Sequence, residues 1–264
     1  MFGIDSHAHV FHRGLALAAG RRYAPDYDAP LESYLAELDQ HGLAHGVLVQ
    51  PSFLGTNNSF LLESLTRAQG RLRGIAVLDP MTPTAELHAL DGAGVVGIRL
   101  NLVGRPLPDL DGVTWRGFLA DVAQLGWQIE LQRAAADLPA LVHRLLAHDL
   151  AVVLDHFALP DRALGTADPA FAEVLTLGAS RRLWVKLSGA YRNGVRGRAF
   201  ARAAYPLLRD AFGLERLMWG SDWPHTQFEA TQTFAASRAF LDELIPDENE
   251  RAAVLTAPRA LFRF

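Results

Sequence analysis

Eight short apolar runs, rich in β-branched residues, recur along this chain of 264 residues, and segments with helical periodicity separate them. Runs that are apolar at nearly every position are typical of parallel strands covered on both faces. The spacing between runs matches the length of one strand–helix unit. These features predict a single-domain α/β protein over residues 1–264, folded as a (β/α)8 TIM-type barrel. The predicted strands lie at 2–10, 46–52, 73–80, 95–102, 127–133, 150–157, 183–189 and 217–224.

The intervening segments carry helix start and stop signals. Pro30 precedes the first of them and Gly42 ends it, as a C-terminal cap does. A doubly wound open sheet is the alternative architecture, but neither GxGxxG nor GxxxxGK[ST] follows any predicted strand. One long loop is expected at 20–30, after the first strand. The predicted helices lie at 31–42, 84–94, 114–125, 137–148, 168–179, 198–212 and 229–243.

Composition excludes several classes of protein. The formal net charge of −4 gives no basic field for nucleic acid or an anionic membrane. The absence of cysteine excludes a disulfide framework, a thiolate metal site and a thiol nucleophile. No apolar run reaches the roughly 20 residues that span a bilayer, and the first residues do not resemble a signal peptide. We therefore expect a cytoplasmic protein that acts on a small molecule, with its oligomeric state left open.

Polar residues gather where the predicted strands end, which is where barrel enzymes carry their chemistry. His7 and His9 are two residues apart on a strand, so both point into the barrel mouth, where they could bind a metal or polarise a carbonyl. A pair of surface histidines is the alternative, and His156 and Asp222 at the ends of other strands weigh against it. Asp222 lies between two tryptophans, so its carboxylate should be partly buried and could act as a base or cap a turn.

Neighbouring charged residues suggest both structural and binding roles. Strand alternation places Asp155 on the face opposite His156, where it would pack or support neighbouring site residues, and Lys186 could be a salt-bridge partner inside the barrel. Arg99, Arg105 and Arg192 end or follow strands, and guanidinium groups bind carboxylates bidentately. Arg105 and Arg192 could each be merely solvated, but three converging arginines would favour a small polyanionic substrate.

Nine motifs give the sequence a strong resemblance to a known family. They span residues 5 to 225 in order: DSHAHVF, RRYAPDYDAP, VLVQPSFLGTNN, GIAVLDP, GIRLNLVGR, LGWQIEL, VVLDHFALPD, WVKLSGAYR and LMWGSDWPH. The chain resembles the amidohydrolase superfamily, and within it the amidohydrolase-related group that contains the 2-pyrone-4,6-dicarboxylate lactonases and related sugar and muconate-type lactonases.

The resemblance implies a role for each matching residue. His7, His9 and His156 would polarise the lactone carbonyl, and Asp222 would take a proton from the attacking water and pass it to the leaving oxygen. The substrate carboxylates and nearby oxygens would be held by Tyr23, Ser52, Arg99, Arg105 and Arg192. Gln132 stands where the pyrone-dicarboxylate lactonases have a tyrosine on strand 5, which leaves the identity of the lactone open.

Two answers remain for the cofactor. Arg99 occupies the strand that carries the bridging lysine in binuclear members of the superfamily, and its positive charge disfavours a second cation. A mononuclear site of His7, His9 and Asp222, with or without His156, would suit zinc. The arginines could instead stabilise the developing oxyanion with no metal.

The sequence thus predicts a hydrolase that opens a small carboxylate-bearing lactone by water attack. One alternative is a zinc-dependent decarboxylase or hydratase of the same superfamily. The other is a barrel that binds ligands without catalysis, against which the polar residues at nearly every strand end count.

Overall fold

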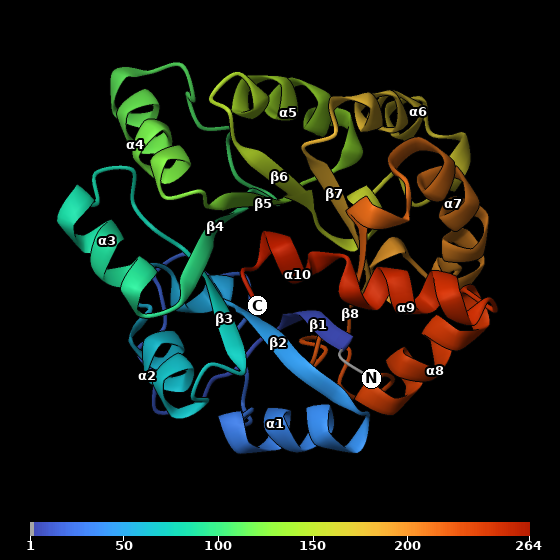
Figure 1. The fold of residues 1–264 in the computed structure, drawn as a ribbon, viewed down its shortest axis with the longest axis horizontal. Helices are drawn as coiled ribbons and strands as arrows, with labels where there is room; N and C mark the ends of the chain where they lie inside the picture. The colour runs from blue at the N-terminus through green and yellow to red at the C-terminus, as the bar shows by residue number, and fades with distance from the viewer. Residues whose placement is uncertain (1–2) are drawn as a thin grey trace.

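Eight parallel strands follow one another in chain order around a barrel, each hydrogen-bonded to the next, in the computed structural model of residues 3–264 (Figure 1). The (β/α)8 fold predicted from the sequence is confirmed. The apolar runs produced the strands because parallel strands covered by helices are buried on both faces. The strands are β1 (Gly3–Ala8), β2 (Leu43–Val49), β3 (Leu72–Ala76), β4 (Val95–Asn101), β5 (Gln128–Gln132), β6 (Ala151–Leu154), β7 (Leu183–Ser188) and β8 (Leu217–Gly220).

Helices form a ring outside the strands (Figure 1). Every predicted helix is present, but the last one begins at Phe234 rather than at 229. Three helices were not predicted: α2 in the second strand–helix unit, and α9 and α10 after the last strand. The helices are α1 (Leu31–Gln40), α2 (Ser59–Arg67), α3 (Thr84–Gly92), α4 (Val113–Gln124), α5 (Leu138–Leu146), α6 (Pro169–Thr176), α7 (Gly197–Phe212), α8 (Phe234–Leu244), α9 (Glu248–Thr256) and α10 (Pro258–Leu261).

The barrel is closed between its first and last strands by a few specific contacts. The backbone N–H of Asp222 donates to the carbonyl of His7 at 2.9 Å, and that of His9 donates to Trp223 at 2.8 Å. The buried carboxylate of Asp5 on β1 accepts hydrogen bonds from the backbone N–H of Ser221 at 2.8 Å and from its hydroxyl at 2.6 Å. These contacts fix the segment after β8 against β1, and with it the residues that both carry into the barrel.

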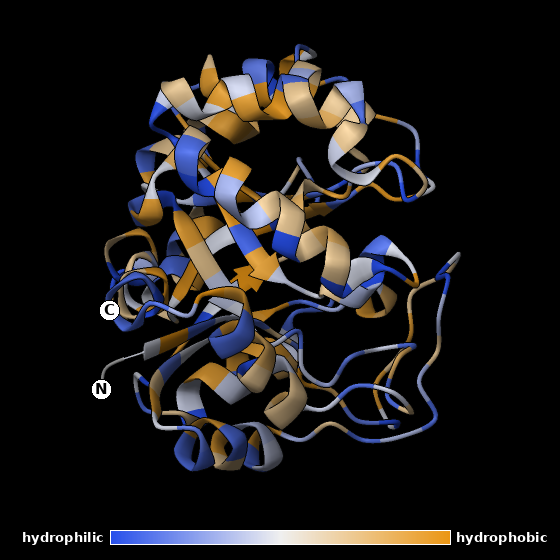
Figure 2. Ribbon diagram, turned by 90° about the vertical axis from the view of Figure 1, so that its right-hand side faces the viewer, coloured by the Kyte–Doolittle hydropathy of each residue, from blue (hydrophilic) through white to orange (hydrophobic). Residues whose placement is uncertain are grey.

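The two ends of the barrel differ. At one end Phe262, fully buried, packs against inward-facing side chains such as Ile4, Val47 and Met218 and so fills that end. The long loops lie on the side away from the two termini (Figure 2). The loop predicted at 20–30 is part of a longer loop, tied at its base where Phe11 pairs with Ala29. No helix within residues 3–264 is both long and apolar enough to cross a membrane.

Replacing Asp5 with alanine should lower the free energy of unfolding by about 2 to 3 kcal/mol, because it leaves the buried donors of Ser221 and Tyr34 without an acceptor. Urea denaturation followed by circular dichroism measures the change. Asp26→Ala, at an exposed position, is the matched control. A loss below about 0.5 kcal/mol would show that Asp5 does not hold the barrel closed.

Candidate active site

A cavity of about 340 Å³ opens at the C-terminal ends of the strands. Eight of the ten residues predicted to form the site line it, together with further residues, among them four from the loops named below. His7 lies beneath the cavity with no exposed surface, and Arg105 is exposed and outside the lining. The predicted residues in the lining are His9, Tyr23, Ser52, Arg99, Gln132, His156, Arg192 and Asp222, and the loop residues are Arg22, Arg162, Gln227 and Phe228.

His9 has a fixed tautomer. Its Nδ1 lies 2.7 Å from the carbonyl oxygen of Val49, which can only accept, so Nδ1 carries the proton. Burial, together with the nearby Arg99 guanidinium, lowers the pKa of His9 to about 3, so the ring is neutral at neutral pH. Its Nε2 therefore offers a lone pair, and it lies 4.0 Å from Oδ1 of Asp222. His9 can accept a proton or bind a metal, but in this form it cannot donate to a carbonyl.

His7 has the opposite arrangement. The Lys186 ammonium donates to its Nδ1 at 3.0 Å, which leaves the proton on Nε2. Burial, with the charge of Lys186, holds the pKa of His7 well below its usual range. Nε2 lies 3.8 Å from Oδ1 of Asp222 and has no hydrogen-bond partner among residues 3–264. His7 thus offers an available N–H donor on the side of its ring that faces Asp222.

Lys186 lies inside the barrel, as the sequence suggested. Its Nζ donates to Oε2 of Glu130 at 2.6 Å and lies 3.5 Å from Oδ1 of Asp155, and both carboxylates are fully buried. Burial raises the pKa of Glu130 to about 7, against the opposing charge of Lys186. Lys186, held by these carboxylates, fixes the orientation of the His7 ring through its contact with Nδ1.

The predicted orientation of Asp155 was wrong. We expected it to face away from His156, yet it lies 3.4 Å from Nδ1 of His7 and accepts a hydrogen bond from Arg99 at 2.9 Å. Strand alternation does not continue past Leu154, where β6 ends, and His156 has a left-handed φ of 52°. Asp155 and His156 both reach the cluster for this reason.

Asp222 is held by several donors. Arg192 donates to its Oδ2 from Nε at 2.5 Å and to its Oδ1 from Nη2 at 3.1 Å, and the Tyr191 hydroxyl donates to Oδ2 at 2.7 Å. Burial by itself raises the pKa of this carboxyl, but Arg192 and His156 outweigh it and hold the pKa well below its usual range. Asp222 is therefore ionised.

His156 lines the cavity, and the chain passes close to it at Gly189. Burial lowers the pKa of His156 to about 4, and its Nδ1 lies 2.9 Å from the hydroxyl of Ser188. Gly189 has a φ of 53°, and a Cβ there would lie 2.7 Å from Oδ2 of Asp222 and 2.9 Å from Nδ1 of His156. Only glycine lets the chain pass this close to both groups.

The cavity is richer in arginine than the sequence alone indicated. Arg99 donates to Asp155 and, at 2.9 Å, to Oε1 of Gln132, so Gln132 is part of the arginine network. Arg22, which the sequence analysis missed, donates to Asn101 at 3.2 Å at the rim. The signals for it were its place in the long loop after β1 and in the RRYAPDYDAP motif. Four arginines thus line the cavity: Arg22, Arg99, Arg162 and Arg192.

Tyr23 is tied to the loop after β8. Its hydroxyl donates to Glu229 at 2.8 Å, and the hydroxyl of Tyr27 donates to the same carboxylate at 2.7 Å. Tyr23 also lines the cavity. The two tyrosines tie the long loop after β1 to the loop after β8 and so shape the entrance.

The donor set needed for one metal ion is present. Ligand atoms of His7, His9 and Asp222, all buried, lie within 4.8 Å of one another. The unprotonated Nε2 of His9 and the Nε2 of His7, which has no hydrogen-bond partner among residues 3–264, could both bind a divalent ion such as zinc. Binding would require His7 to move its proton to Nδ1, where Asp155 could accept it in place of the contact from Lys186.

The fold and the site define a (β/α)8-barrel protein with a buried histidine–aspartate centre at the mouth of the barrel. A model of the amidohydrolase family matches residues 4–264. The chain belongs to the amidohydrolase family, as its motifs indicated.

Similar proteins point within this family to lactone hydrolases. A solved structure from Pseudomonas putida, of a protein provisionally named a 2-pyrone-4,6-dicarboxylic acid hydrolase, is 49% identical with a TM-score of 0.94, over 99% of this chain and 97% of that chain. A probable 2-pyrone-4,6-dicarboxylic acid hydrolase from Acinetobacter baumannii, with citric acid bound, is 40% identical with a TM-score of 0.97, over 100% of both chains. The 2-pyrone-4,6-dicarboxylate hydrolase of Comamonas testosteroni is 31% identical over 84% of this chain and 76% of its own length.

Proposed function

We propose that this protein hydrolyses the ring ester of a small lactone bearing carboxylate groups, of the 2-pyrone-4,6-dicarboxylate type. The observation that carries the proposal is the buried cluster of His7, His9 and Asp222 at the base of a cavity lined by four arginines. The cluster suits attack by water on a carbonyl, and the arginines suit a substrate with more than one carboxylate. The names of the similar proteins and the citric acid bound to one of them support the same substrate class.

The protonation states of Asp222, His9 and His7 assign each of them a different role in the reaction. Asp222 takes a proton from water, whose oxygen attacks the ring carbonyl carbon, while Nε2 of His9 accepts the other hydrogen of that water as a hydrogen bond. The N–H at Nε2 of His7 stabilises the oxyanion that forms. When the ring C–O bond breaks, the proton on Asp222 passes to the leaving ring oxygen.

Arg192 links substrate binding to the base. Its guanidinium donates to both carboxylate oxygens of Asp222. A substrate carboxylate competes for that guanidinium, and as it binds, the carboxylate of Asp222 becomes free to accept a proton. A lactone without a carboxylate would leave the pair intact.

We propose that this chemistry needs no metal, since Lys186 sets His7 as a donor and the arginines already supply positive charge. If a divalent ion does bind, His7, His9 and Asp222 would hold it, and it would polarise the carbonyl and lower the pKa of water. A zinc-dependent decarboxylase would need that ion.

Metal analysis of the purified protein, paired with assays before and after chelation, tests the proposal. The assay panel contains 2-pyrone-4,6-dicarboxylate, muconolactones, sugar lactones and aromatic acids that could be decarboxylated. Hydrolysis of a carboxylated lactone that survives chelation supports the proposal. Release of CO₂ from an aromatic acid with no lactone opened would replace it with the decarboxylase, and tight ligand binding without turnover would replace it with a binding protein.

The acid limb of kcat/KM is expected near pH 4 rather than near the usual histidine value of 6.5, because the site requires neutral histidines. The pKa of His156 is lowered to about 4 and that of His9 to about 3, so the neutral forms persist as the pH falls. Initial rates measured after brief pH jumps give the profile, with circular dichroism at each pH as the control for folding. A limb near pH 6.5 that persists in folded Glu130→Gln, which removes the carboxyl with a pKa of about 7, would contradict the assigned protonation states of the histidines.

A further inference from the structure

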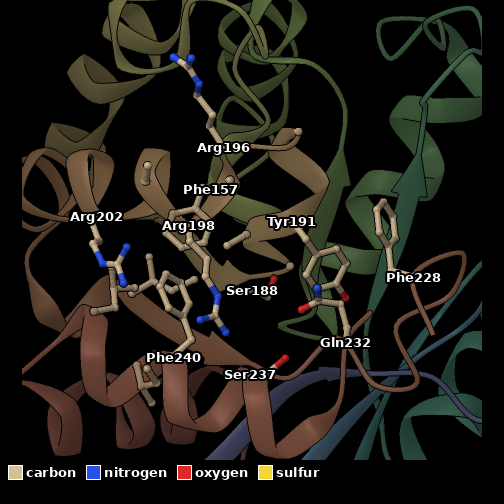
Figure 3. A pocket seen from close by; sticks show the side chains of 18 of the residues that line it. Phe157, Ser188, Tyr191, Arg196, Arg198, Arg202, Phe228, Gln232, Ser237 and Phe240 are labelled. Atoms are coloured by element: carbon tan, nitrogen blue, oxygen red, sulfur yellow. The ribbon is translucent and has the colours of Figure 1, made fainter. Parts of the chain in front are cut away.

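A second, larger cavity of about 880 Å³ lies outside the barrel, between α7, α8 and the outer face of β7 and β8 (Figure 3). Lys186 points into the barrel, so its neighbour Leu187 points outward, and Leu187 lines this cavity with Trp219 of β8. The volume lies within the range of about 300 to 1,000 Å³ that holds small organic molecules. The cavity is therefore large enough for a ligand of its own.

The floor of this cavity is apolar and aromatic. Phe157, Trp219 and Phe240 line it together with Leu241 and Leu244, and each of these side chains is otherwise buried. Aromatic walls favour a flat, apolar body that can stack against them. The floor alone would suit a planar ring or an unsaturated acyl group.

The rim of the cavity is positive. The lining includes four arginines, Arg162, Arg196, Arg198 and Arg202, and among residues 3–264 it includes no aspartate or glutamate. The guanidinium groups of Arg198 and Arg202 lie over the ring of Phe240, at 4.7 Å and 5.5 Å from its centroid, and flank it in Figure 3. Glu243 pairs with Arg202 at 2.8 Å and more loosely with Arg198 at 3.9 Å, which leaves an excess of positive charge at the opening.

Two lining residues touch the catalytic cluster. Ser188 holds Nδ1 of His156 at 2.9 Å, and the Tyr191 hydroxyl donates to Asp222 at 2.7 Å. Arg162 and Phe228 line both cavities. A molecule in the second cavity would therefore press on groups that orient the general base and a neighbouring histidine.

We propose that this cavity is a second binding site, for an aromatic monocarboxylate, whose occupancy changes the turnover rate without competing with the lactone. The ring of the ligand lies on the aromatic floor, and its carboxylate meets Arg198 and Arg202. The effect on turnover passes through Tyr191 and Ser188.

Cinnamate is a suitable probe, because it joins a planar apolar body to one carboxylate. Titration followed by isothermal calorimetry should show one molecule bound per chain, with a Kd unaffected by saturating citrate, which serves as an active-site polyanion. The double variant R198Q/R202Q should weaken cinnamate about tenfold or more, since it removes the charged partners from exposed positions without disturbing the core. Ser237→Phe, which fills part of the cavity from α8, should weaken it comparably.

Arg238→Gln is the matched control. Arg238 lies on α8 next to Ser237, pairs with Asp242 and is outside the cavity lining. In the wild type, cinnamate should change kcat by about twofold or more with no rise in KM, and Ser237→Phe should abolish this response. Three results would overturn the proposal: displacement of cinnamate by citrate, equal affinity in all variants, or no binding at about 10 mM. Binding is measured without turnover, so its outcome does not depend on the lactonase assignment, whereas the kcat response rests on the proposed function.

Discussion

Replacing Asp222 with asparagine is expected to lower kcat by about 10² to 10⁴-fold, the range for loss of a general base. Asparagine keeps the size of the side chain and can still accept a hydrogen bond from Arg192, but it cannot take a proton from water. Because the same group is proposed to return the proton to the leaving oxygen, both halves of the reaction should suffer. Steady-state rates on a carboxylated lactone measure the effect.

Controls separate this loss from a loss of structure. Circular dichroism and urea denaturation should show a folded variant, and calorimetry should show that a non-reacting polyanion such as citrate still binds. Asp26→Asn, at an exposed position, should keep full activity. If the folded D222N protein retained turnover within about tenfold of the wild type, the base would have to be another group.

Replacing Arg192 with glutamine is expected to change which substrates react. For a dicarboxylated lactone, kcat/KM should fall about 100-fold, since one charged bidentate contact is lost. For a lactone without a carboxylate, kcat/KM should stay constant or rise, because Asp222 is no longer engaged by the guanidinium. Parallel assays of the two lactones give the ratio that reports the role of Arg192.

The control for this variant is Arg67→Gln, on the exposed face of α2, where Arg67 pairs with Glu63. It should change neither substrate's kinetics. An equal loss on both lactones in R192Q would assign Arg192 to holding Asp222 in place rather than to recognising the substrate.

The barrel was predictable because its signal is repeated. Each buried parallel strand produces a continuous apolar run, and the sheet contains eight of them in chain order. The helices that were missed have weaker signals. Helix α2 follows a short turn that begins at Ser52, within the predicted second strand, and α10 is only four residues long.

The site was predictable where residues come from strand ends and less so elsewhere. His9, Asp222 and Arg192 follow strands directly, so the fold itself brings them together. Asp155 was misplaced because the regular alternation of side chains stops at the left-handed turn of His156. Arg22 and the contact from Tyr191 to Asp222 depend on loop paths, which no local pattern in the sequence specifies.

The cluster of His7, His9 and Asp222 spans the seam between the first and last strands, and this has a consequence for how the chain acquires activity. Asp5 and Ser221, which share a hydrogen bond across this seam, lie 216 positions apart in the sequence. Such a contact forms only after a very long loop has closed, whereas the intermediate strand–helix units need only local contacts. During refolding, helical signal should therefore return before enzymatic activity does, and a chain stalled with seven units assembled would look nearly native by spectroscopy yet be inert.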